Sequence, residues 1–588
     1  MYQAHRNYLS NILNLSLQEN NRNRFWRYIK SRKADNIGVS PIRDEGRLQS
    51  HPRKKAELLN RQFKSVFTQE DASNIPEPSG PAQPPIEELS IENKGVQKLL
   101  ERINPSKASG PDAIPNRVLK EAAEEISPIL TAIFKQSIEQ EQLPSDWKKA
   151  YVTPVFKKGD RHQPENYRPV SLTCVCCKLL EHIICRHILQ HLEEHNILAG
   201  VQHGFRKGHS CETQLIETLH DLQQHKDNKH QVDVIVLDFS KAFDTVPHRR
   251  LLKKIKHLGV KGKIHGWIAN FLYARSQQVI VEGERSKSVS VDSGVPQGTV
   301  LGPLLFLMHI NDLPDAVNSQ VRLFADDCLL YRPVNSIDDQ HAIQNDLRGL
   351  ETWATAWGMR FNAKKCYVLR TLPSARTKSK DYTYDLSGHA LNEVNSTPYL
   401  GVTLSNSLKW DAHISSVCAK ANATLGFVKR NLKFAPPELK ATAYKSLVRS
   451  KLEYACTVWD PYRKKDIQDL EKVQRRAARF TSNDFKRTSS VTVMLQTLGW
   501  GTLEHRRRNR RIQMLNKIIC NETGIPKESY TKPGPSRTRS SNNNKLAVYS
   551  AKSEDFKNSF FPRTIRDWNA TTQAEINTIS ISAGQCHH

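Results

Sequence analysis

The most informative hydrophobic pattern of the chain surrounds two acidic residues, Asp326 and Asp327. Mostly apolar residues flank the pair on both sides, between Val321 and Tyr331, in runs of strand length. The pattern predicts two buried strands with the two carboxylates at the turn between them. Two like charges beside a hydrophobic hairpin raise each other's pKa and cost stability unless a cation neutralises them. Taken alone, a polar hairpin tip is the simpler interpretation.

A second stretch, from Val232 to Asp244, changes this interpretation. It begins as a β-branched strand that delivers Asp238 at its end, and Pro247 marks a break soon after. Only a folded sheet can bring Asp238 beside Asp326, because the two are far apart in the sequence. Three carboxylates at the ends of adjacent strands form an all-oxygen site suited to Mg²⁺. Two such ions activate a 3′-hydroxyl and stabilise a leaving pyrophosphate, so the pattern predicts nucleotidyl transfer.

Most of the remaining pattern is helical. In the N-terminal segment Phe25, Trp26 and Tyr28 lie among basic residues, so this helix either stacks on nucleic acid or docks on the next domain. The last apolar island, Phe556 to Asn569, is expected to pack back on the body. One apolar stripe at helical spacing predicts a core helix: Ile343, Leu347, Leu350, Trp353 and Trp357.

A series of sequence blocks follows one another along the chain: KASGPDAIPNRVLK, PVFKKGD, NYRPVSL, QHGFRKGHS, DFSKAFDTVPH, SGVPQGTVLGPLLF, FADD, WGMRFNAKKC, PYLGV, LEYACTVWDPY, LEKVQRRAARF and FFPRTIRDWN. These blocks and their order resemble the reverse transcriptases of non-LTR (LINE-type) retrotransposons, in particular the jockey-like and chicken-repeat-like groups. The resemblance extends from about Phe25 to about Trp568.

The resemblance implies an α+β fold of the right-hand polymerase type, with fingers, a palm that carries an antiparallel sheet, and a helical thumb. The implied parts are a helical N-terminal segment over 1–66, a Pro-rich linker over 67–92, fingers over 93–230, a palm over 231–405, a basic helical thumb over 406–525, and a linker and C-terminal tail over 526–588.

The same resemblance implies an RNA-directed DNA polymerase that extends a DNA 3′-hydroxyl on an RNA template. Asp238, Asp326 and Asp327 are the implied catalytic ligands of two Mg²⁺ ions, with Mn²⁺ as a substitute. Lys365 is the implied proton donor to pyrophosphate, although a surface lysine explains this position nearly as well.

Six residues are expected to contact the incoming deoxynucleotide: Lys157, Lys158, Arg168, Phe243, Gln297 and Gly298. Each cation, taken alone, is equally well an ordinary solvated charge, and the Gln297 loop is equally well a plain helix start. Phe243 is the implied steric gate beneath the sugar, where a 2′-hydroxyl has to fit; the alternative is a core ring that anchors its turn.

Six further residues are expected to contact the primer or template: Arg206, Tyr399, Leu400, Gly401, Arg475 and Arg476. Arg206 touches either the template or the fingers core, and His209 and Cys211 stand nearby where relatives carry Arg and Thr. The arginines of LEKVQRRAARF and of LEHRRRNRRIQML are expected to grip the phosphates of a duplex.

Composition narrows the choice of partners. A formal net charge of +27 indicates a polyanionic partner, so the expected partners are an RNA template, a DNA primer and their hybrid, with deoxynucleoside triphosphates as substrates.

No apolar run approaches 18 residues, so the sequence predicts no membrane-spanning helix. The 11 cysteines show no disulfide framework, and the CxxC spacing of Cys174 and Cys177 lacks a second pair for zinc, so reduced thiols in the cytosol or nucleus are expected.

Two other functions compete with an active polymerase. The first is a catalytically inactive, nucleic-acid-binding remnant, which the intact carboxylates, Gln297 and phosphate-binding candidates disfavour. The second is a maturase-like role, for which no maturase-like extension of the chain is evident.

An endonuclease domain has no room before the linker, so the sequence predicts a truncated copy, a partial gene model, or a polymerase that relies on a separate endonuclease.

Overall fold

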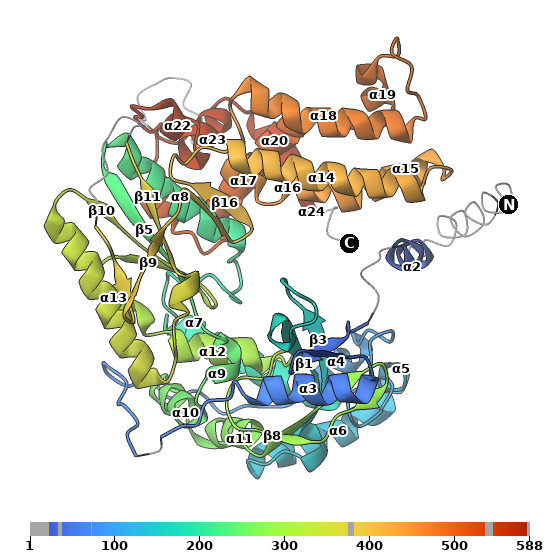
Figure 1. Cartoon of the computed structure of the whole chain (residues 1–588), viewed down its shortest axis with the longest axis vertical. Coiled ribbons are helices and arrows are strands. Elements are labelled where there is room, and N and C mark those ends of the chain that lie inside the picture. Colours follow the sequence, from blue (N-terminus) through green and yellow to red (C-terminus); the bar gives the residue numbers. More distant parts are fainter. Residues whose placement is uncertain are drawn as a thin grey trace.

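The structure, a computed structural model, describes residues 23–32, 38–71, 73–373, 382–534 and 545–584, together with Asn7. Two five-stranded sheets and the helices around them form the body of the protein (Figure 1). The mixture of helices and sheets confirms the α+β class. The remaining parts of the N-terminal segment and the low-complexity stretch over 535–544 lie outside the described residues.

The sheet that carries Asp238 has the strand order β14-β11-β5-β10-β9. Neighbouring strands are antiparallel except β11 and β14, which are parallel. In this register Asp327 lies directly opposite Asp238, so the two strand ends meet at one edge. The strands are β5 (Gln231–Asp238), β9 (Gln320–Phe324), β10 (Asp327–Val334), β11 (Tyr367–Thr371) and β14 (Asn392–Glu393).

Both faces of this sheet are buried. Successive side chains of a strand point to opposite sides of the sheet, so one strand contributes to two hydrophobic cores. In β5, Ile235 and Leu237 belong to one hydrophobic core, whereas Val232 and Val234 belong to another. Helix α13 (Ile337–Trp357) covers the first face with its predicted apolar stripe, all of which is buried, and α8 (Cys211–Asp227) covers the second. This two-sided packing fixes the strand ends that present the aspartates.

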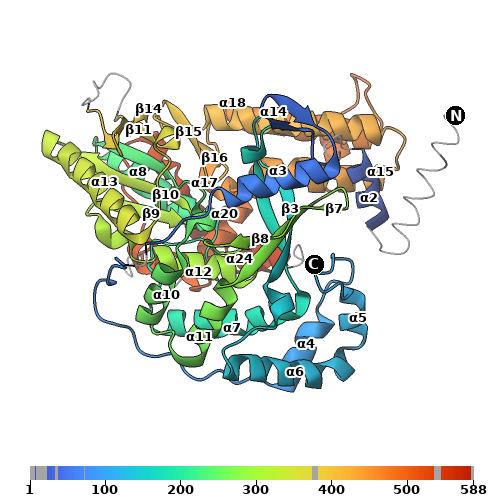
Figure 2. The same cartoon turned by 60° about the horizontal axis from the view of Figure 1, so that its bottom comes forward.

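A second sheet has the order β4-β3-β6-β7, with β8 paired to β6. Helix α3 (Pro52–Lys64) packs against it (Figure 2), and Leu59 and Phe63 of this helix share a small core with Val152 and Val279. The strands are β3 (Lys149–Phe156), β4 (Tyr167–Leu172), β6 (Arg275–Val281), β7 (Glu284–Arg285) and β8 (Val289–Val291).

The N-terminal segment is not wholly helical, contrary to the prediction. A hairpin of β1 (Ile42–Asp44) and β2 (Arg47–Gln49) separates α2 (Asn23–Ser31) from α3. The Phe25 and Tyr28 side chains of α2 are buried, and the Tyr28 hydroxyl donates to the Asn431 carbonyl at 3.2 Å. These two rings are therefore docked on the protein body, which confirms the docking alternative for them.

The predicted linker over 67–92 contains no helix or strand in its described residues, yet it is bound along the protein surface. The Glu70 carboxylate accepts from the backbone N–H and the guanidinium of Arg250, and the Gln83 N–H donates to the His257 carbonyl at 2.9 Å. We therefore describe it as a strap rather than a free linker.

Except for α8 and α13, the helices between the strap and β11 lie in the lower half of the view in Figure 1. They are α4 (Asn93–Glu101), α5 (Asn116–Glu121), α6 (Ala123–Glu139), α7 (Val175–Glu194), α9 (Ala242–Thr245), α10 (His248–His257), α11 (Gly262–Leu272) and α12 (Leu301–Ile310). Short 3₁₀ turns are η2 (Ser145–Lys148), η3 (Pro164–Asn166), η4 (Leu313–Ala316) and η5 (Ala363–Lys365). Two hairpins follow β11: β12 (Asp385–Leu386) with β13 (His389–Ala390), and β15 (Ser396–Tyr399) with β16 (Val402–Ser405).

A second set of helices lies along the upper edge of Figure 1. They are α14 (Asp411–Asn431), α15 (Pro437–Ala443), the π-helix η6 (Tyr444–Arg449), α16 (Ser450–Glu453), α17 (Cys456–Trp459), α18 (Lys464–Thr481), α19 (Val491–Thr497) and α20 (Leu503–Ile519). No helix among the described residues is long and apolar enough to span a membrane.

The C-terminal segment packs back on the body, as predicted. Phe560, Phe561 and Trp568 are buried, and the Asp227 carboxylate at the end of α8 accepts from the backbone N–H groups of Lys552 and Ser553. The helices of this segment are α21 (Lys527–Tyr530), α22 (Glu554–Lys557), α23 (Phe560–Asn569) and α24 (Gln573–Gly584).

Candidate active site

The β9–β10 hairpin presents two of the three predicted carboxylates. Its turn consists of Ala325 and Asp326, and Asp327 begins β10 opposite Phe324. This confirms the predicted pair of strands and the position of the acidic pair at their turn. Ala325 has φ 52°, a left-handed conformation that costs a non-glycine residue roughly 1–2 kcal/mol. A strained residue therefore stands immediately before Asp326.

The three carboxylates share one electrostatic environment. Burial, and then the negative charge of Asp238, raise the pKa of Asp326. Burial, followed by the charges of Asp326 and Asp238, raises the pKa of Asp327 to about 6. Like charges this close disfavour the ionised form of each other. A cation bound at this edge of the sheet would therefore relieve the repulsion and stabilise the ionised carboxylates.

Three cationic side chains gather around these carboxylates from separate elements. Lys365 at the end of η5 places Nζ 3.8 Å from Asp238 Oδ2. Burial, and then repulsion from Arg168 and Lys365, lower the pKa of Lys157, while the attraction of Asp238 opposes this shift. Lys157 follows β3 and Arg168 lies in β4, so the second sheet supplies cations to the edge of the first.

These contacts separate the two predicted lysines. Lys157 and Arg168 both act on Asp326, and each lowers its pKa against the effect of burial. Lys158 is exposed beside them. All four cations are exposed, but the structure brings Lys157, Arg168 and Lys365 into electrostatic contact with the aspartates, and Lys158 is not among the groups that most shift the pKa of Asp326 or Asp327.

No group of three or more His, Cys, Asp or Glu side chains in the described parts of the chain is arranged to hold a metal ion. The donor chemistry of the aspartate cluster nevertheless fits a hard divalent cation. Asp238, Asp326 and Asp327 offer only oxygen, which Mg²⁺ and Mn²⁺ prefer. Their mutual repulsion, seen in the raised pKa of Asp326 and Asp327, is the unbalanced charge that such an ion relieves.

The loop before α12 is tied to the turn after β5. Gln297 donates from Nε2 to Asp244 Oδ1 at 2.8 Å, and its carbonyl accepts from the Ser171 N–H at 2.7 Å. Gly298, at φ 103°, approaches Ser171 so closely that a Cβ there would lie 2.6 Å from the Ser171 carbonyl oxygen. Burial raises the pKa of Asp244 to about 6. The acceptor Asp244 orients the Gln297 amide, and the sequence alone did not indicate this partner.

Phe243 is half-buried beside this loop. Its ring stacks on Phe306 of α12 with centroids 4.4 Å apart and meets Phe205 edge-on at 6.4 Å. The contact with α12 shows that the ring packs on the core on at least one side. It leaves the steric-gate prediction and the core-ring alternative both open.

The predicted primer grip is only partly accessible. The Tyr399 side chain is buried, and its hydroxyl accepts from Gln214 Nε2 at 3.3 Å, so its ring cannot contact a primer. The turn Leu400–Gly401 is more accessible, and both of its residues have positive φ. Sequence reasoning missed Tyr454, an exposed ring that donates from its hydroxyl to the Leu400 carbonyl at 3.0 Å.

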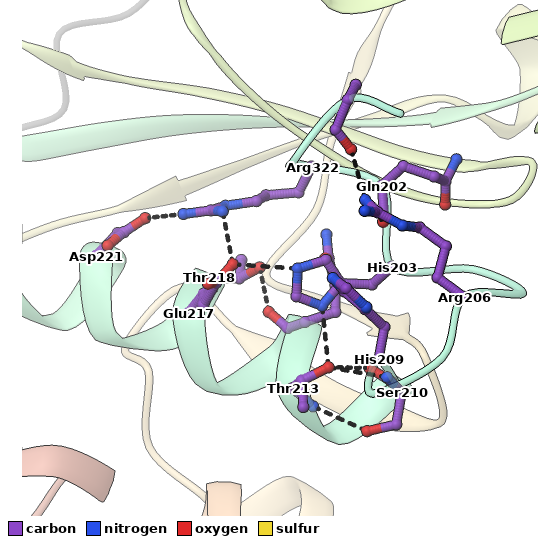
Figure 3. A network of polar contacts seen from close by, with 12 residues as sticks. Gln202, His203, Arg206, His209, Ser210, Thr213, Glu217, Thr218, Asp221 and Arg322 are labelled. Carbon is purple, nitrogen blue, oxygen red and sulfur yellow. Dashed lines mark hydrogen bonds and ion pairs between the residues drawn. The ribbon is translucent and has the colours of Figure 1, made fainter. Parts of the chain in front are cut away.

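Arg206 binds its own loop. Its Nη1 donates to the carbonyls of Ala199 and Gln202, and Figure 3 shows the guanidinium close to Gln202. His209 stacks edge-on against His203 with centroids 4.7 Å apart. This arrangement favours the fingers-core alternative for Arg206 over a template contact.

The two arginine-rich helices differ. Arg475 and Arg476 of α18 are exposed, and Arg476 also donates to Asn422 of α14 at 3.1 Å. In α20, Arg507 and Arg511 are buried, and both donate to one acceptor carboxylate, that of Asp460. The prediction that α20 grips a duplex through its arginines is therefore wrong for Arg507 and Arg511, because buried side chains cannot reach phosphates.

Comparison with known proteins agrees with this geometry. Residues 155–404 match the family described as reverse transcriptase (RNA-dependent DNA polymerase). The chain is 28% identical over 399 residues to a probable RNA-directed DNA polymerase from transposon X-element of Drosophila melanogaster, covering 65% of this chain and 43% of that protein. It is 26% identical over 410 residues to the RNA-directed DNA polymerase from mobile element jockey of the same organism, covering 67% and 44% respectively. The chain thus spans about half the length of the curated relatives it matches.

Proposed function

We propose that the chain is an RNA-directed DNA polymerase of the non-LTR retrotransposon type, because residues 155–404 match the reverse transcriptase family and the chain is similar to RNA-directed DNA polymerases from transposon X-element and mobile element jockey. The observation that carries this proposal is the meeting of Asp238, Asp326 and Asp327 at one sheet edge, within electrostatic reach of Lys157 and Arg168. The substrates are deoxynucleoside triphosphates, a DNA primer and an RNA template.

The parts of the molecule then take the following roles. The central sheet with α8 and α13 is the palm, β3, β4 and β6 with the helices beneath them are the fingers, and α14 to α20 are the thumb. The strap over 67–92 joins the N-terminal segment to the fingers and palm, and the C-terminal segment braces α8. The boundaries expected over 93–230, 231–405 and 406–525 are retained with two exceptions: α8 (Cys211–Asp227) is assigned to the palm, and β6 to β8 join the fingers sheet.

Three aspartates perform the central task, which is to bind the reacting groups at the sheet edge. Asp238 and Asp326 are the main ligands for divalent cations, and Asp327 flanks them. Two Mg²⁺ ions, or Mn²⁺ in their place, would when bound lower the pKa of the primer 3′-hydroxyl and would stabilise negative charge at the α-phosphate. The repulsion among the aspartates keeps this edge selective for a multiply charged cation.

Cationic side chains orient the triphosphate. Lys157 and Arg168 stand at the ends of paired strands, so their charges are held on a rigid support opposite the carboxylates. Arg168 offers a planar guanidinium that matches phosphate oxygens. Lys365, 3.8 Å from Asp238, lies where it can protonate the departing pyrophosphate.

The nucleobase and sugar face the Gln297 loop. Asp244 fixes the amide of Gln297, whose oxygen is then directed away from Asp244. Phe243 stands beside this loop and limits the volume available at the 2′ position. The primer end rests on the Leu400–Gly401 turn, with the exposed Tyr454 ring beside it.

Primer extension tests the proposal. Purified protein with Mg²⁺ is expected to extend a DNA primer annealed to RNA, and to incorporate deoxynucleotides complementary to the template. Binding of the hybrid without extension, in Mg²⁺ or Mn²⁺, would instead identify a nucleic-acid-binding remnant. A closed circular duplex should remain intact under the same conditions, since we propose that strand cleavage is supplied by a separate endonuclease.

A further inference from the structure

The loop that precedes α8 runs beside the catalytic hairpin. Gln202 pairs with Leu323 of β9 in a parallel bridge. The His203 N–H donates to the Leu323 carbonyl at 2.9 Å, and the Leu323 N–H donates to the Val201 carbonyl at 3.0 Å. Residues 201–203 therefore cover the outer edge of the sheet, next to the turn that presents Asp326.

The Gln202 side chain reaches that turn directly. It is only 2% exposed, and its Oε1 accepts from the Gly204 N–H at 2.7 Å and from the Ala325 N–H at 2.9 Å. Ala325 is the residue with φ 52°. A hydrogen bond contributes about 1 kcal/mol, which is comparable with the strain that the left-handed conformation imposes. The amide oxygen thus stabilises the conformation that aims the next residue, Asp326.

Gly204 makes the approach of the loop possible. A Cβ at this position would lie 2.4 Å from the Ala325 nitrogen and 3.0 Å from Gln202 Oε1. Real Cβ atoms do not come so close to backbone, so any other residue would push the loop away from the turn. Gly200 in the same loop has open space around its Cβ position, which shows that the close contact is local to Gly204.

A buried polar network anchors this loop on two elements (Figure 3). His203 Nδ1 lies 2.9 Å from Thr213 Oγ1, and His203 Nε2 lies 3.3 Å from the Glu217 carboxylate, both in α8. Glu217 in turn accepts from Arg322 of β9 at 2.8 Å. The loop is therefore held by the helix and by the strand that ends at the catalytic turn.

The structure also shows that Gln202 is poorly suited to a purely stabilising role. Its Nε2 is buried and has no hydrogen-bond partner among the described residues. A buried amide nitrogen without a partner costs about 1–3 kcal/mol. An apolar side chain of the same volume would avoid this cost, and would lose only the acceptor that holds the Ala325 N–H.

We propose that Gln202 is a positioning residue for catalysis: its amide oxygen holds the Ala325 backbone so that Asp326 faces Asp238. The inference rests on the proposed polymerase function. It follows that Gln202 acts on the chemical step and not on deoxynucleotide affinity, because the cations proposed to bind the triphosphate belong to the other sheet: Lys157 follows β3, and Arg168 lies in β4.

Two substitutions separate positioning from packing. Gln202→Glu keeps an oxygen that accepts both N–H groups, whereas Gln202→Met keeps the volume and loses the acceptor. Displacement of a catalytic group by about 1 Å costs roughly 10²-fold in rate, so Gln202→Met is expected to lower kcat for single-nucleotide addition by roughly 10- to 100-fold, with KM within about twofold. Gln202→Glu should keep the higher kcat of the two. A packing role predicts the opposite order, because a buried charge is costly.

Matched glycine variants and an activity-independent measurement complete the test. Gly204→Ala should lower kcat as Gln202→Met does, and Gly200→Ala should not. Amide hydrogen exchange at Ala325 should accelerate in Gln202→Met and stay slow in Gln202→Glu. Unchanged exchange and kcat in Gln202→Met would overturn the inference while leaving the polymerase intact. A wild-type protein that extends no primer would refute the proposed function instead, and the exchange result would still decide whether Gln202 holds the turn.

Discussion

Two charged clusters in this protein differ in how their carboxylates are neutralised. Asp460 is buried and accepts from Arg507 at 2.6 Å and from Arg511 at 2.9 Å, so its charge is matched inside the fold. Asp326 and Asp327 stand beside Asp238: the charge that acts most on Asp326 is that of Asp238, and the charges that act most on Asp327 are those of Asp326 and Asp238, ahead of Lys157 and Arg168 in both cases. The nearest ion pair at that edge, between Lys365 and Asp238, is long at 3.8 Å and partly exposed.

The difference shows where the protein neutralises its buried charge with its own side chains and where it leaves charge for a ligand to neutralise. The buried Asp460 carboxylate has guanidinium partners in Arg507, Arg511 and also Arg563, whose Nη1 lies 3.4 Å from Asp460 Oδ2, and breaking such a cluster damages the fold. Carboxylates that repel one another beside solvent destabilise the protein until a cation binds. We therefore expect substitutions in the first cluster to affect stability, and substitutions in the second to affect catalysis with little cost to stability.

The largest effect is expected at the catalytic edge. Asp326→Asn and Asp238→Asn should each lower the rate of primer extension by at least about 10³-fold, as removal of a catalytic group does in other enzymes. The melting temperature should stay level or rise, because a repulsive carboxylate has been removed. Rate measurement at saturating deoxynucleotide, together with thermal unfolding, checks both parts.

Neighbouring acidic residues serve as references for this result. Asp327→Asn should also be severe, with some residual activity. Asp338, exposed in the first turn of α13, offers a matched control, and Asp338→Asn should leave extension unchanged. Efficient extension by the Asp238 or Asp326 variant would refute the assignment of these residues as metal ligands.

The opposite pattern is expected for the buried cluster. Asp460→Asn leaves Arg507 and Arg511 without their shared anion, and breaking a buried ion pair costs about 3–5 kcal/mol of unfolding free energy. Denaturant titration measures this loss. Asp469→Asn is the matched control, because Asp469 pairs with Lys472 at the surface of α18, where such a pair contributes less than about 1 kcal/mol. Equal stability of the two variants would show that the Asp460 cluster does not anchor α20.

A smaller and more selective effect is expected at Phe243. If the ring limits space at the sugar, Phe243→Val should raise the ratio of ribonucleotide to deoxynucleotide efficiency by roughly 10- to 100-fold. If the stacking on Phe306 is its whole role, the cavity should cost about 1–4 kcal/mol and lower both efficiencies alike. The ratio, rather than either rate, distinguishes the two interpretations.

The sequence predicted the arrangement of strands and aspartates at this sheet edge well, because its signals are local. A β-branched strand that ends at Asp238 and apolar runs around Asp326 indicate strand ends directly, and one register then brings Asp327 opposite Asp238. The buried stripe of α13 could be predicted equally well, because its apolar residues recur at helical spacing in the sequence. In these places the short-range pattern and the tertiary structure require the same arrangement.

Long-range polar partners could not be predicted in this way. The arginines of α18 and α20 look alike in sequence, and only the fold brings Asp460 against Arg507 and Arg511. Tyr399 is buried in a hydrophobic core, and its hydroxyl accepts from Gln214 of α8, which is far away in the sequence. Gln202 carried no signal of its contact with Ala325, because a hydrogen bond between a loop and a turn leaves no period in the chain.

The last prediction concerns the arginines that the fold leaves exposed, and it is the smallest effect. Arg475 and Arg476 protrude from α18, whereas the side chains of Arg507 and Arg511 are used internally. Each phosphate neutralised by a cation contributes about one power of salt to the affinity for a duplex. Replacement of both exposed arginines by Ala should therefore flatten the salt dependence of hybrid binding by up to about two powers.

A charge-matched control separates direct contact from the general field of the protein. Lys94→Ala with Lys98→Ala removes the same charge from α4, which lies in the lower half of Figure 1, away from α18. This variant should keep the wild-type slope, and neither variant should change base preference, because phosphate contacts carry no sequence information. Shorter products are expected only from the α18 variant, since weaker grip raises dissociation between additions. If both variants flatten the slope equally, α18 attracts nucleic acid through net charge alone and does not hold the duplex.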